Sequence, residues 1–209
     1  MKTLRPLLIS FEGIDGSGKS TQCKVLYHEL LDRGYGVHLY REPGGTKISE
    51  KIRDILLDRE NMEMSPVTEM LLYFSSRNQL ITEKVLPALS RGEIVLLDRF
   101  VDSTLAYQGH GRDLSIEDIR KVADVAIGGL SPDLTILVDT PLDTAEDRMD
   151  DRELDRLEAE NADFKQRTRN GYLQLVKDEP HRFLVLDGNQ GIDVLKRQVI
   201  ARVDQLLDK

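Results

Sequence analysis

The eight residues 13–20 are the sequence feature that most limits what this chain can fold into. They read Gly-Ile-Asp-Gly-Ser-Gly-Lys-Ser and fit the pattern G-x-x-x-x-G-K-[ST], whose backbone amides surround a polyphosphate. An apolar run, residues 7–11, precedes them, and a segment that favours a helix, residues 19–33, follows. Because this strand, loop and helix order is what a phosphate loop needs, we reject the alternative of a plain glycine-rich turn.

The residue types in this loop suit the binding of ATP. Glycines leave room for a close approach of the phosphates, Lys19 places a cation on the β- and γ-phosphates, and the Ser20 hydroxyl reaches Mg²⁺. The predicted ATP-binding residues are Gly13, Ile14, Asp15, Gly16, Ser17, Gly18, Lys19, Ser20 and Thr21.

Four more apolar runs predict the remaining strands, at residues 37–40, 94–97, 134–138 and 183–186. Helix-length segments separate them, and residues 65–89, 116–127, 163–176 and 192–207 are the clearest helix candidates. Strands that are apolar throughout are buried on both faces, and long connections imply parallel crossovers. We therefore predict an α/β P-loop NTPase fold with a five-stranded parallel sheet flanked by helices.

Length and charge narrow the class of protein further. The 209 residues suit one domain, which we take as residues 1–209, and no long apolar run or signal-like N-terminus is present. A net charge of −8 opposes binding to nucleic acid or anionic membranes. The single cysteine, Cys23, and the spacing of the four histidines argue against disulfides and zinc. We expect a cytoplasmic protein.

Two aspartates end predicted strands. Asp98 follows residues 94–97, at the edge where a parallel sheet presents side chains to a ligand, and suits Mg²⁺ or its water shell. The alternative for Asp98 is a helix cap. Asp139 follows residues 134–138, and here we favour the structural role, because Pro141 is expected to begin a helix that Thr140 or Asp139 could cap.

Arginines separate the classes of protein that share a phosphate loop. GTPases usually specify guanine with N-K-x-D, but none of the five asparagines is followed by lysine. The arginines instead fall into two groups, which suggests two phosphate sites. A phosphate acceptor is already anionic, so transfer between nucleotides needs alignment, charge neutralisation and exclusion of water rather than a general base. The groups are Arg41, Arg53, Arg77 and Arg99, then Arg148, Arg152, Arg156, Arg167 and Arg169.

Residues 148–161, RMDDRELDRLEAEN, carry much charge and little apolar content. Such a solvated excursion suits a mobile lid that closes over bound nucleotides. A solvated charged helix with i,i+4 ion pairs fits the same residues equally well.

Two longer motifs are the most specific pieces of the chain: residues 41–46, REPGGT, and residues 98–109, DRFVDSTLAYQG. Together with Asp155-Arg156 and residues 167–169, RTR, they resemble the thymidylate kinases over most of the chain, from the phosphate loop to the helix around Tyr172. The resemblance implies transfer of the γ-phosphoryl group of Mg-ATP to dTMP, giving dTDP and ADP for dTTP synthesis. It also implies a homodimer, for which the helix at residues 65–89 has enough apolar surface.

The resemblance also implies roles for individual residues. Arg41 and Arg99 would hold the acceptor phosphate, and Arg53 and Arg77 would line the nucleotide pocket. Thr104 and Gln108 would contact the thymine edge. Asp15 would approach the 3′-hydroxyl of the sugar, and Tyr107 would crowd its 2′ position. Similar enzymes commonly place phenylalanine four residues before the pocket arginine, where this chain has Tyr73. Because residues i and i+4 share a helix face, we choose Tyr73 over the adjacent Phe74 to stack on the base.

The phosphate loop carries no arginine, whereas some similar enzymes place one there. The lid must then supply the cation, and Arg148, Arg152 and Arg156 are the candidates. By analogy with related kinases, adenine would rest near Arg148 and residues 187–191. Two alternatives remain: a kinase for another nucleoside monophosphate, and a regulatory module that binds ATP without an acceptor.

Overall fold

The structure is a computed structural model and describes residues 6–149 and 153–208. In this part of the chain five strands form one sheet, in the order β2-β3-β1-β4-β5, and every neighbouring pair is parallel. The predicted sheet is confirmed, and each strand runs one residue beyond its apolar run, onto a polar residue. The strands are β1 Leu7–Glu12, β2 Val37–Arg41, β3 Ile94–Asp98, β4 Leu134–Asp139 and β5 Phe183–Asp187.

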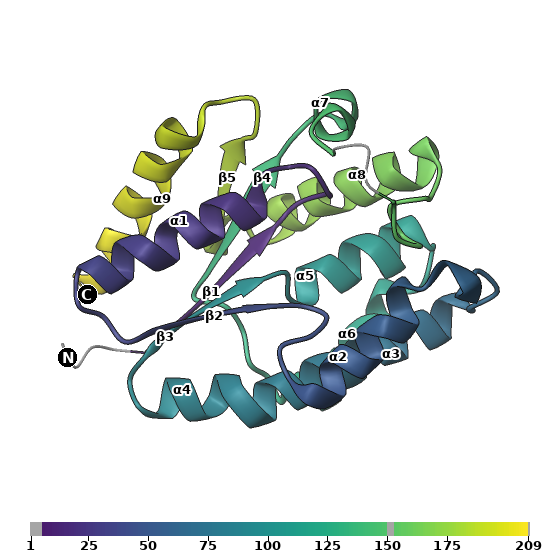
Figure 1. The fold of residues 1–209 in the computed structure, drawn as a ribbon, viewed down its shortest axis with the longest axis horizontal. Coiled ribbons are helices and arrows are strands. Elements are labelled where there is room, and N and C mark those ends of the chain that lie inside the picture. Colours follow the sequence, from purple (N-terminus) through teal and green to yellow (C-terminus); the bar gives the residue numbers. More distant parts are fainter. Residues whose placement is uncertain (1–5, 150–152, 209) are drawn as a thin grey trace.

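Helices connect the strands, and most match the predicted segments (Figure 1). The α-helices are α1 Lys19–Asp32, α2 Lys47–Leu57, α3 Pro66–Leu80, α4 Leu86–Ser90, α5 Val101–Thr104, α6 Ile116–Ile127, α7 Leu142–Asp147, α8 Ala162–Asp178 and α9 Ile192–Leu207. Short 3-10 turns lie at η1 Arg59–Asn61 and η4 Pro180–Arg182, and π-helical segments at η2 Ile81–Val85 and η3 Leu105–Gly111. The predicted helix at 65–89 corresponds to α3, η2 and α4, and the π-helical turn comes just before Pro87, which lacks an amide hydrogen.

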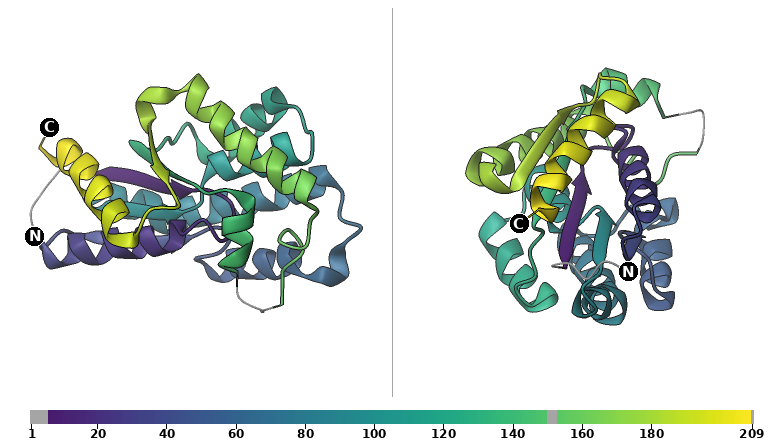
Figure 2. Two further views of the ribbon diagram at one scale, coloured as in Figure 1. Left: turned by 90° about the horizontal axis from the view of Figure 1, so that it is seen from above. Right: turned by 90° about the vertical axis from the view of Figure 1, so that its left-hand side faces the viewer.

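The sheet has helices on both faces (Figures 1 and 2). Leu7, Ile9 and Phe11 of β1 pack with buried residues of α1 and α9 on one face. The intervening Leu8 points the other way and packs with α3, η2 and α4. Further along that face, η3, α6 and α8 form a third apolar cluster. Burial on both faces explains why the strands are apolar throughout.

Side-chain caps fix where several helices begin. The side chains of Thr46, Ser65, Ser115 and Asn161 accept hydrogen bonds from the third backbone amide that follows each of them, at the starts of α2, α3, α6 and α8. These helices surround the carboxyl ends of β1, β2 and β3, where parallel sheets bind ligands. Among the described residues no helix is long and apolar enough to cross a membrane.

Candidate active site

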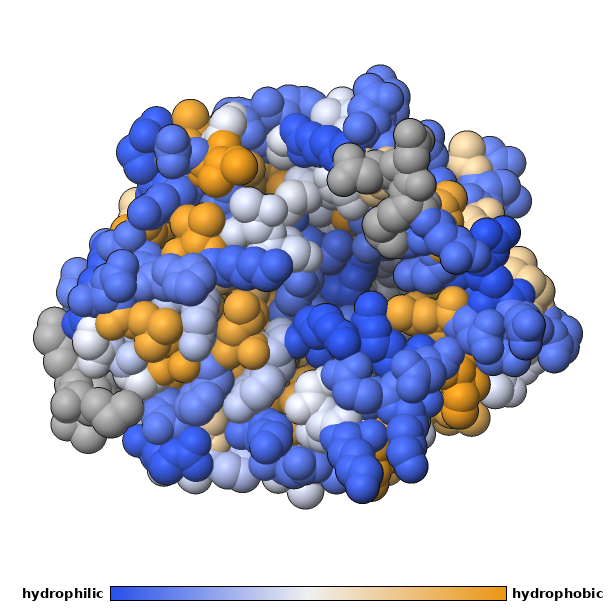
Figure 3. All heavy atoms as spheres, in the orientation of Figure 1, coloured by the Kyte–Doolittle hydropathy of each residue, from blue (hydrophilic) through white to orange (hydrophobic). Residues whose placement is uncertain are grey.

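A cleft of about 370 Å³ opens at the carboxyl ends of β1, β2 and β3. Figure 3 shows a hollow, lined mostly by hydrophilic residues, between the phosphate loop and α2. The cleft joins both predicted sites, since it reaches from the phosphate loop to the residues after β2 and β3. The predicted site residues in its lining are Asp15, Lys19, Ser20, Arg41, Arg53, Tyr73, Asp98, Arg99, Thr104, Tyr107 and Gln108.

Residues 13–18 form the predicted loop between β1 and α1. Lys19 is 5% exposed, and its Nζ lies 3.3 Å from the Ile14 carbonyl and 3.4 Å from Asp15 Oδ1. Both contacts are long, so the ammonium can turn toward a stronger anion. Gly16 has φ of +77°, and a Cβ on it would lie 2.0 Å from the Ala145 carbonyl oxygen of α7. Thr21 lies exposed in the first turn of α1.

Asp15, Arg99 and Tyr107 form a hydrogen-bonded cluster in the middle of the cleft. Arg99 Nη2 donates to Asp15 Oδ1 at 2.6 Å and to the Tyr107 hydroxyl at 3.1 Å, while that hydroxyl donates to Asp15 Oδ2 at 3.0 Å. Burial on its own would raise the pKa of Asp15, but the charges of Arg99 and Lys19 outweigh it and hold this pKa well below its usual range. Asp15 is therefore ionised at neutral pH.

Two arginines converge beside this cluster. Arg41 Nη1 and Arg53 Nη1 both donate to the Pro43 carbonyl, at 2.7 and 3.0 Å, and Arg41 Nη2 also donates to Glu50 at 2.8 Å. Burial and the charge of Arg41 lower the pKa of Arg53. Two guanidinium groups held this close, with one carboxylate between them, make a strong site for an additional anion.

Helix α3 supplies the wall opposite the phosphate loop. Tyr73 lines the cleft, whereas Phe74 is 2% exposed and belongs to the core. Of the two aromatic residues considered for stacking on the base, only Tyr73 is therefore in a position to do so. Arg77, expected in the lining, lies one layer deeper. Its guanidinium donates to Glu42 Oε2 at 2.6 Å, to Thr104 Oγ1 at 2.9 Å and to the Phe100 carbonyl at 3.0 Å. Arg77 therefore holds Thr104 and Glu42, which do line the cleft.

The second half of the predicted lid is not a solvated excursion. Arg156 is 2% exposed, and its Nη1 lies 2.6 Å from Glu69 of α3 while its Nε donates to the Leu56 carbonyl of α2. Glu69 also accepts from Gln108 and Arg112. Arg156 is thus a buried link between the lid and α3, while its Nη2 has no hydrogen-bond partner among the described residues. Its assignment as a cation for the transferring phosphoryl group stays a prediction. Residues 157 and 158 are buried as well.

Arg148 is the lid arginine that the structure brings to the phosphate loop. Its Nη2 donates to the Gly188 carbonyl at 2.9 Å, and its Nη1 lies 3.5 Å from the Ser17 carbonyl. It therefore bridges the phosphate loop and the loop between β5 and α9. That adenine rests there stays a prediction. Arg152 lies outside the described residues.

Replacing Arg156 with methionine is expected to lower the free energy of unfolding by about 3 kcal/mol, because the buried Glu69 carboxylate loses its shortest ion pair. Urea denaturation measures this loss. The matched variant Arg148→Met should unfold within about 0.5 kcal/mol of the parent chain, since Arg148 is exposed, but lose about 100-fold in kcat. If Arg156→Met kept its stability and lost kcat instead, Arg156 would act on the transferring phosphoryl group.

The two strand-end aspartates have different surroundings. Asp98 lines the cleft, as does Ser20, and the residue before α5 is Phe100, so Asp98 does not take the capping alternative. Asp139, one of the two residues expected to be able to cap α7, does not cap it. Its two oxygens accept from Arg169 Nε and Nη2 at 2.7 and 3.0 Å, and Pro141 takes the position before α7.

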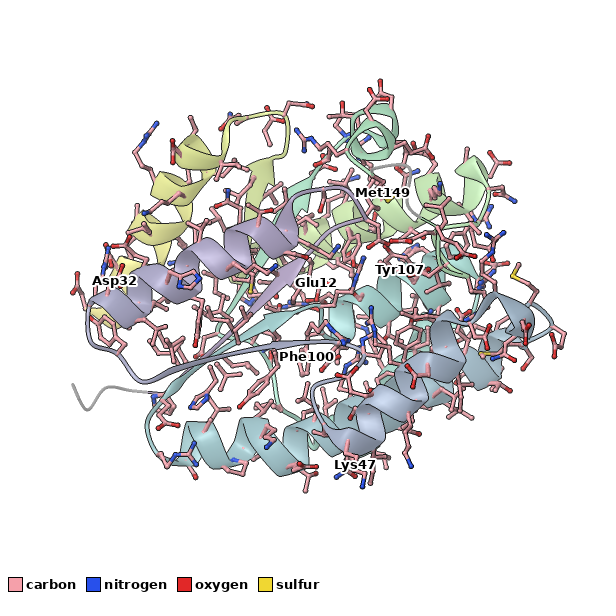
Figure 4. The ribbon with its side chains drawn as sticks, in the orientation of Figure 1. Glu12, Asp32, Lys47, Phe100, Tyr107 and Met149 are labelled. Atoms are coloured by element: carbon pink, nitrogen blue, oxygen red, sulfur yellow. The ribbon has the colours of Figure 1, made fainter. Side chains whose placement is uncertain are left out.

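Sequence reasoning missed several carboxylates of the site. Glu42, Asp155 and Glu158 line the cleft, and Glu12 lies directly beneath it at the end of β1. Figure 4 shows Glu12 and Phe100 close together at the ends of β1 and β3. A charged residue at the end of an apolar strand was the available signal for Glu12. The motif Asp155-Arg156 was the available signal for Asp155. Nothing in the local sequence marks Glu158, which lies at the cleft because Arg156 contacts α2 and α3.

Comparison with known proteins places this geometry in a family. A family model described as thymidylate kinase matches residues 11–199. The thymidylate kinase of Caldanaerobacter subterraneus subsp. tengcongensis is 49% identical over 98% of each chain. That of Thermoanaerobacter sp. is 53% identical, over 95% of this chain and 98% of its own. The crystal structure of thymidylate kinase from Ehrlichia chaffeensis superposes with a TM-score of 0.78 at 31% identity, covering 95% of this chain and 98% of the other.

Proposed function

Since the chain belongs to the thymidylate kinase family, we propose that its cleft aligns ATP with dTMP and transfers the γ-phosphoryl group, giving ADP and dTDP. The observation that carries the proposal is a single cleft with a phosphate loop and Lys19 at one end and Arg41, Arg53 and Arg99 at the other. One cleft that serves a polyphosphate at one end and a second phosphate at the other fits a phosphotransferase better than an ATP-binding switch.

The donor nucleotide occupies the loop side. The residues 13–21 bind the phosphates of ATP, Lys19 neutralises the β- and γ-phosphates, and Arg148 adds the cation that the loop lacks. The Gly188 carbonyl already bonded to Arg148 lies in the 187–191 loop, where adenine would rest. The transferring phosphoryl group thus meets positive charge from α1 and from the end of α7.

The acceptor occupies the deeper side. Arg41 and Arg99 hold the phosphate of dTMP, Arg53 adds charge, and Tyr73 stacks on the base. Thr104 and Gln108 meet the thymine edge, with Thr104 held by Arg77 and the Gln108 amide oriented by its bond to Glu69. Asp15, which is ionised and held by Arg99, accepts a hydrogen bond from the 3′-hydroxyl.

Chemistry in this arrangement depends on alignment and charge. The attacking phosphate oxygen of dTMP is already anionic, so no residue has to remove a proton from it. The guanidinium groups fix the line of attack in bidentate geometry and neutralise the crowded oxygens. A lid anchored at Arg156 closes the cleft on the side of Glu158 and keeps water from taking the phosphoryl group.

Mg²⁺ is the metal that this donor set fits. Among the described residues no cluster of three His, Cys, Asp or Glu side chains could hold a metal by itself. A hydroxyl and one carboxylate are enough for Mg²⁺, which keeps water and phosphate oxygens as its other ligands. Ser20 and Asp98, both in the cleft lining, are the residues that would hold it. When bound, the ion neutralises charge on the β- and γ-phosphates.

The test is ADP release from Mg-ATP with dTMP, dUMP, UMP, CMP, AMP and GMP offered separately. We expect the highest kcat/KM with dTMP, dUMP second, and little ADP without an acceptor. A different preferred monophosphate would keep the kinase and remove the assignment of Thr104, Gln108 and Tyr107. Equal ADP release without any acceptor would instead indicate the regulatory ATP-binding module.

Tyr107 sets the preference for deoxyribose in this proposal, because a 2′-hydroxyl would meet its ring and its anchored hydroxyl. Tyr107→Phe is expected to raise the kcat/KM of UMP relative to dUMP about tenfold, since it removes the anchored hydroxyl from that position. The matched variant Tyr73→Phe, at the base, should leave that ratio unchanged. An unchanged ratio in Tyr107→Phe would exclude the role.

A homodimer would cover the exposed apolar side chains on adjacent helices: Ile48 and Ile55 of α2, Val67 and Leu71 of α3, and Val125 of α6. Leu71→Glu should then give a monomer in analytical ultracentrifugation, whereas Leu31→Glu on α1, of similar exposure, should not. A monomeric parent chain would dismiss the dimer. The proposal takes residues 1–209 as one kinase domain working in the cytoplasm, where nucleoside monophosphates are available.

A further inference from the structure

Glu12 is completely buried at the end of β1, one residue before the phosphate loop. Its Oε1 accepts from the Phe100 amide at 2.7 Å. Its Oε2 lies 2.6 Å from the Ser103 hydroxyl and 3.0 Å from the Tyr172 hydroxyl of α8. A buried carboxylate is costly unless hydrogen bonds compensate its burial, and those of Glu12 come from the backbone amide that follows Arg99 and from two hydroxyls.

Arg99 needs external support. It has φ of +75°, in the left-handed region that non-glycine residues avoid. Its own amide donates to the Phe11 carbonyl at 2.9 Å, and the next amide, that of Phe100, is the one held by Glu12. These two bonds to consecutive residues of β1 keep the backbone turn in place, so that the Arg99 side chain points into the cleft rather than along the strand.

The guanidinium of Arg99 is fixed by the same carboxylate through two hydroxyls. Its Nη1 donates to Ser103 Oγ at 3.2 Å and to the Tyr172 hydroxyl at 3.3 Å, the two groups that contact Glu12. It also donates to the Gly13 carbonyl at 3.2 Å, which ties the acceptor arginine to the first residue of the phosphate loop. Glu12 thus controls both the backbone and the side chain of Arg99.

The hydrogen count at this site points to a proton on Glu12. The oxygens of Glu12, Ser103 and Tyr172 make three mutual contacts, because the two hydroxyls are also 2.7 Å apart. Two hydroxyl protons cannot occupy three such contacts, whereas a protonated carboxyl supplies the third. Burial and the charge of Asp102 raise the pKa of Glu12 to about 7, against the lowering by Ser103, Arg99 and the Phe100 amide.

We propose that Glu12 is a positioning residue for phosphoryl transfer, which in its protonated form holds Arg99 in the left-handed turn that presents its guanidinium to the acceptor phosphate. The inference rests on the proposed function, in which Arg99 binds that phosphate. The charged and titratable groups that face Glu12 are Arg99 and Asp102 from the segment after β3 and Tyr172 from α8. Loss of the proton adds an anion beside the acceptor phosphate and draws Arg99 back toward β1.

The experiment measures dTMP binding without ATP by calorimetry, between pH 6 and pH 8.5, for the parent chain, Glu12→Gln and Glu12→Ala. Glutamine has the shape of the protonated acid, and like that acid it is uncharged, can accept from the Phe100 amide and can donate to the two hydroxyls. We expect Glu12→Gln to bind dTMP within about threefold of the parent at pH 6, and Glu12→Ala to bind at least about tenfold more weakly at every pH. The ratio of parent to Glu12→Gln affinities should fall as pH rises through about 7. Because the phosphate of dTMP titrates identically in both experiments, the ratio isolates Glu12.

Stability gives an independent readout with a defined sign. A carboxyl group whose pKa is raised by folding stabilises the folded state fully below its unfolded value of 4.5, and the contribution is lost as pH rises through about 7. Between pH 4.5 and about 7 the parent chain should therefore lose free energy of unfolding relative to Glu12→Gln, and above that range the difference should stay constant. Ser10→Ala is the matched control, since Ser10 lies on the same face of β1 but bonds to Thr135. It should weaken folding without changing dTMP affinity.

Two outcomes would overturn the proposal: a folded Glu12→Ala that binds dTMP as the parent does, or a Glu12→Gln that fails as badly as Glu12→Ala and keeps the parental pH profile. If Glu12→Ala does not fold, Tyr172→Phe is the variant to test. It removes one of the two hydroxyls that link Glu12 to Arg99 and should weaken dTMP binding several-fold. A parent chain that binds dTMP but phosphorylates another acceptor faster would refute the proposed function and leave the role of Glu12 intact.

Discussion

Lys19→Met is expected to lower kcat/KM for ATP about 1000-fold, the largest single effect we anticipate in this chain. Lys19 is 5% exposed, and its present contacts with Ile14 and Asp15 are longer than 3.2 Å. A γ-phosphate offers the ammonium a stronger partner, and in the water-poor end of the cleft that interaction is only weakly screened. Steady-state kinetics with saturating dTMP measures the loss.

Lys24→Met is the matched control, since Lys24 is exposed one turn and a half further along α1. It should change kcat/KM less than twofold, and both variants should keep the parental thermal unfolding midpoint within a few degrees. A Lys19→Met enzyme with more than a tenth of the parental kcat/KM would show that the loop backbone alone carries the phosphates.

Gly16→Ala is expected to cost about 100-fold in kcat/KM for ATP. A methyl group there would meet the Ala145 carbonyl at 2.0 Å, and that oxygen is backbone, so either the loop or α7 has to move. Movement of the loop misaligns amides that bind phosphate, and movement of α7 displaces Arg148, which follows its last turn. Steady-state kinetics and ATP binding by calorimetry should show the loss in the same variant.

Gly34→Ala separates this clash from the general strain of a left-handed residue. Gly34 has nearly the same φ, +82°, but a Cβ there meets nothing within 4 Å. It should lose about 1 kcal/mol of stability and keep the parental kcat/KM. Equal kinetic losses in the two variants would mean that backbone strain, not the contact with α7, explains Gly16.

The parts that sequence predicted are those that local pattern determines. Five apolar runs with long connections are enough for a parallel sheet, and the loop at 13–20 carries its own glycines and lysine. Segment η3 was not predicted, because its residues Leu105–Gly111 include two glycines and owe their helical turn to packing against α6 and α8. The strands were predicted one residue short, since polar residues such as Glu12 and Asp98 still pair in the sheet.

The arginines mark the limit of sequence reasoning at the site. Their division into two groups along the sequence indicated two phosphate sites. The sequence does not say, however, which guanidinium group faces a ligand. Arg41, Arg53 and Arg99 line the cleft. Arg77 instead forms a buried ion pair with Glu42, and Arg156 forms one with Glu69. Those pairs join residues 35 and 87 positions apart, so no local pattern could reveal them.

The anchoring of Arg156 to α2 and α3 bears on the order in which substrates bind. With one end of the lid held at Glu69 and the Leu56 carbonyl, any closing movement has to be taken up on the side of α7, next to the donor phosphates. We therefore expect the walls that receive the acceptor to stay in place whether or not the donor is present. Either nucleotide should therefore bind first, with double-reciprocal plots that intersect and dissociation constants that barely depend on the other substrate.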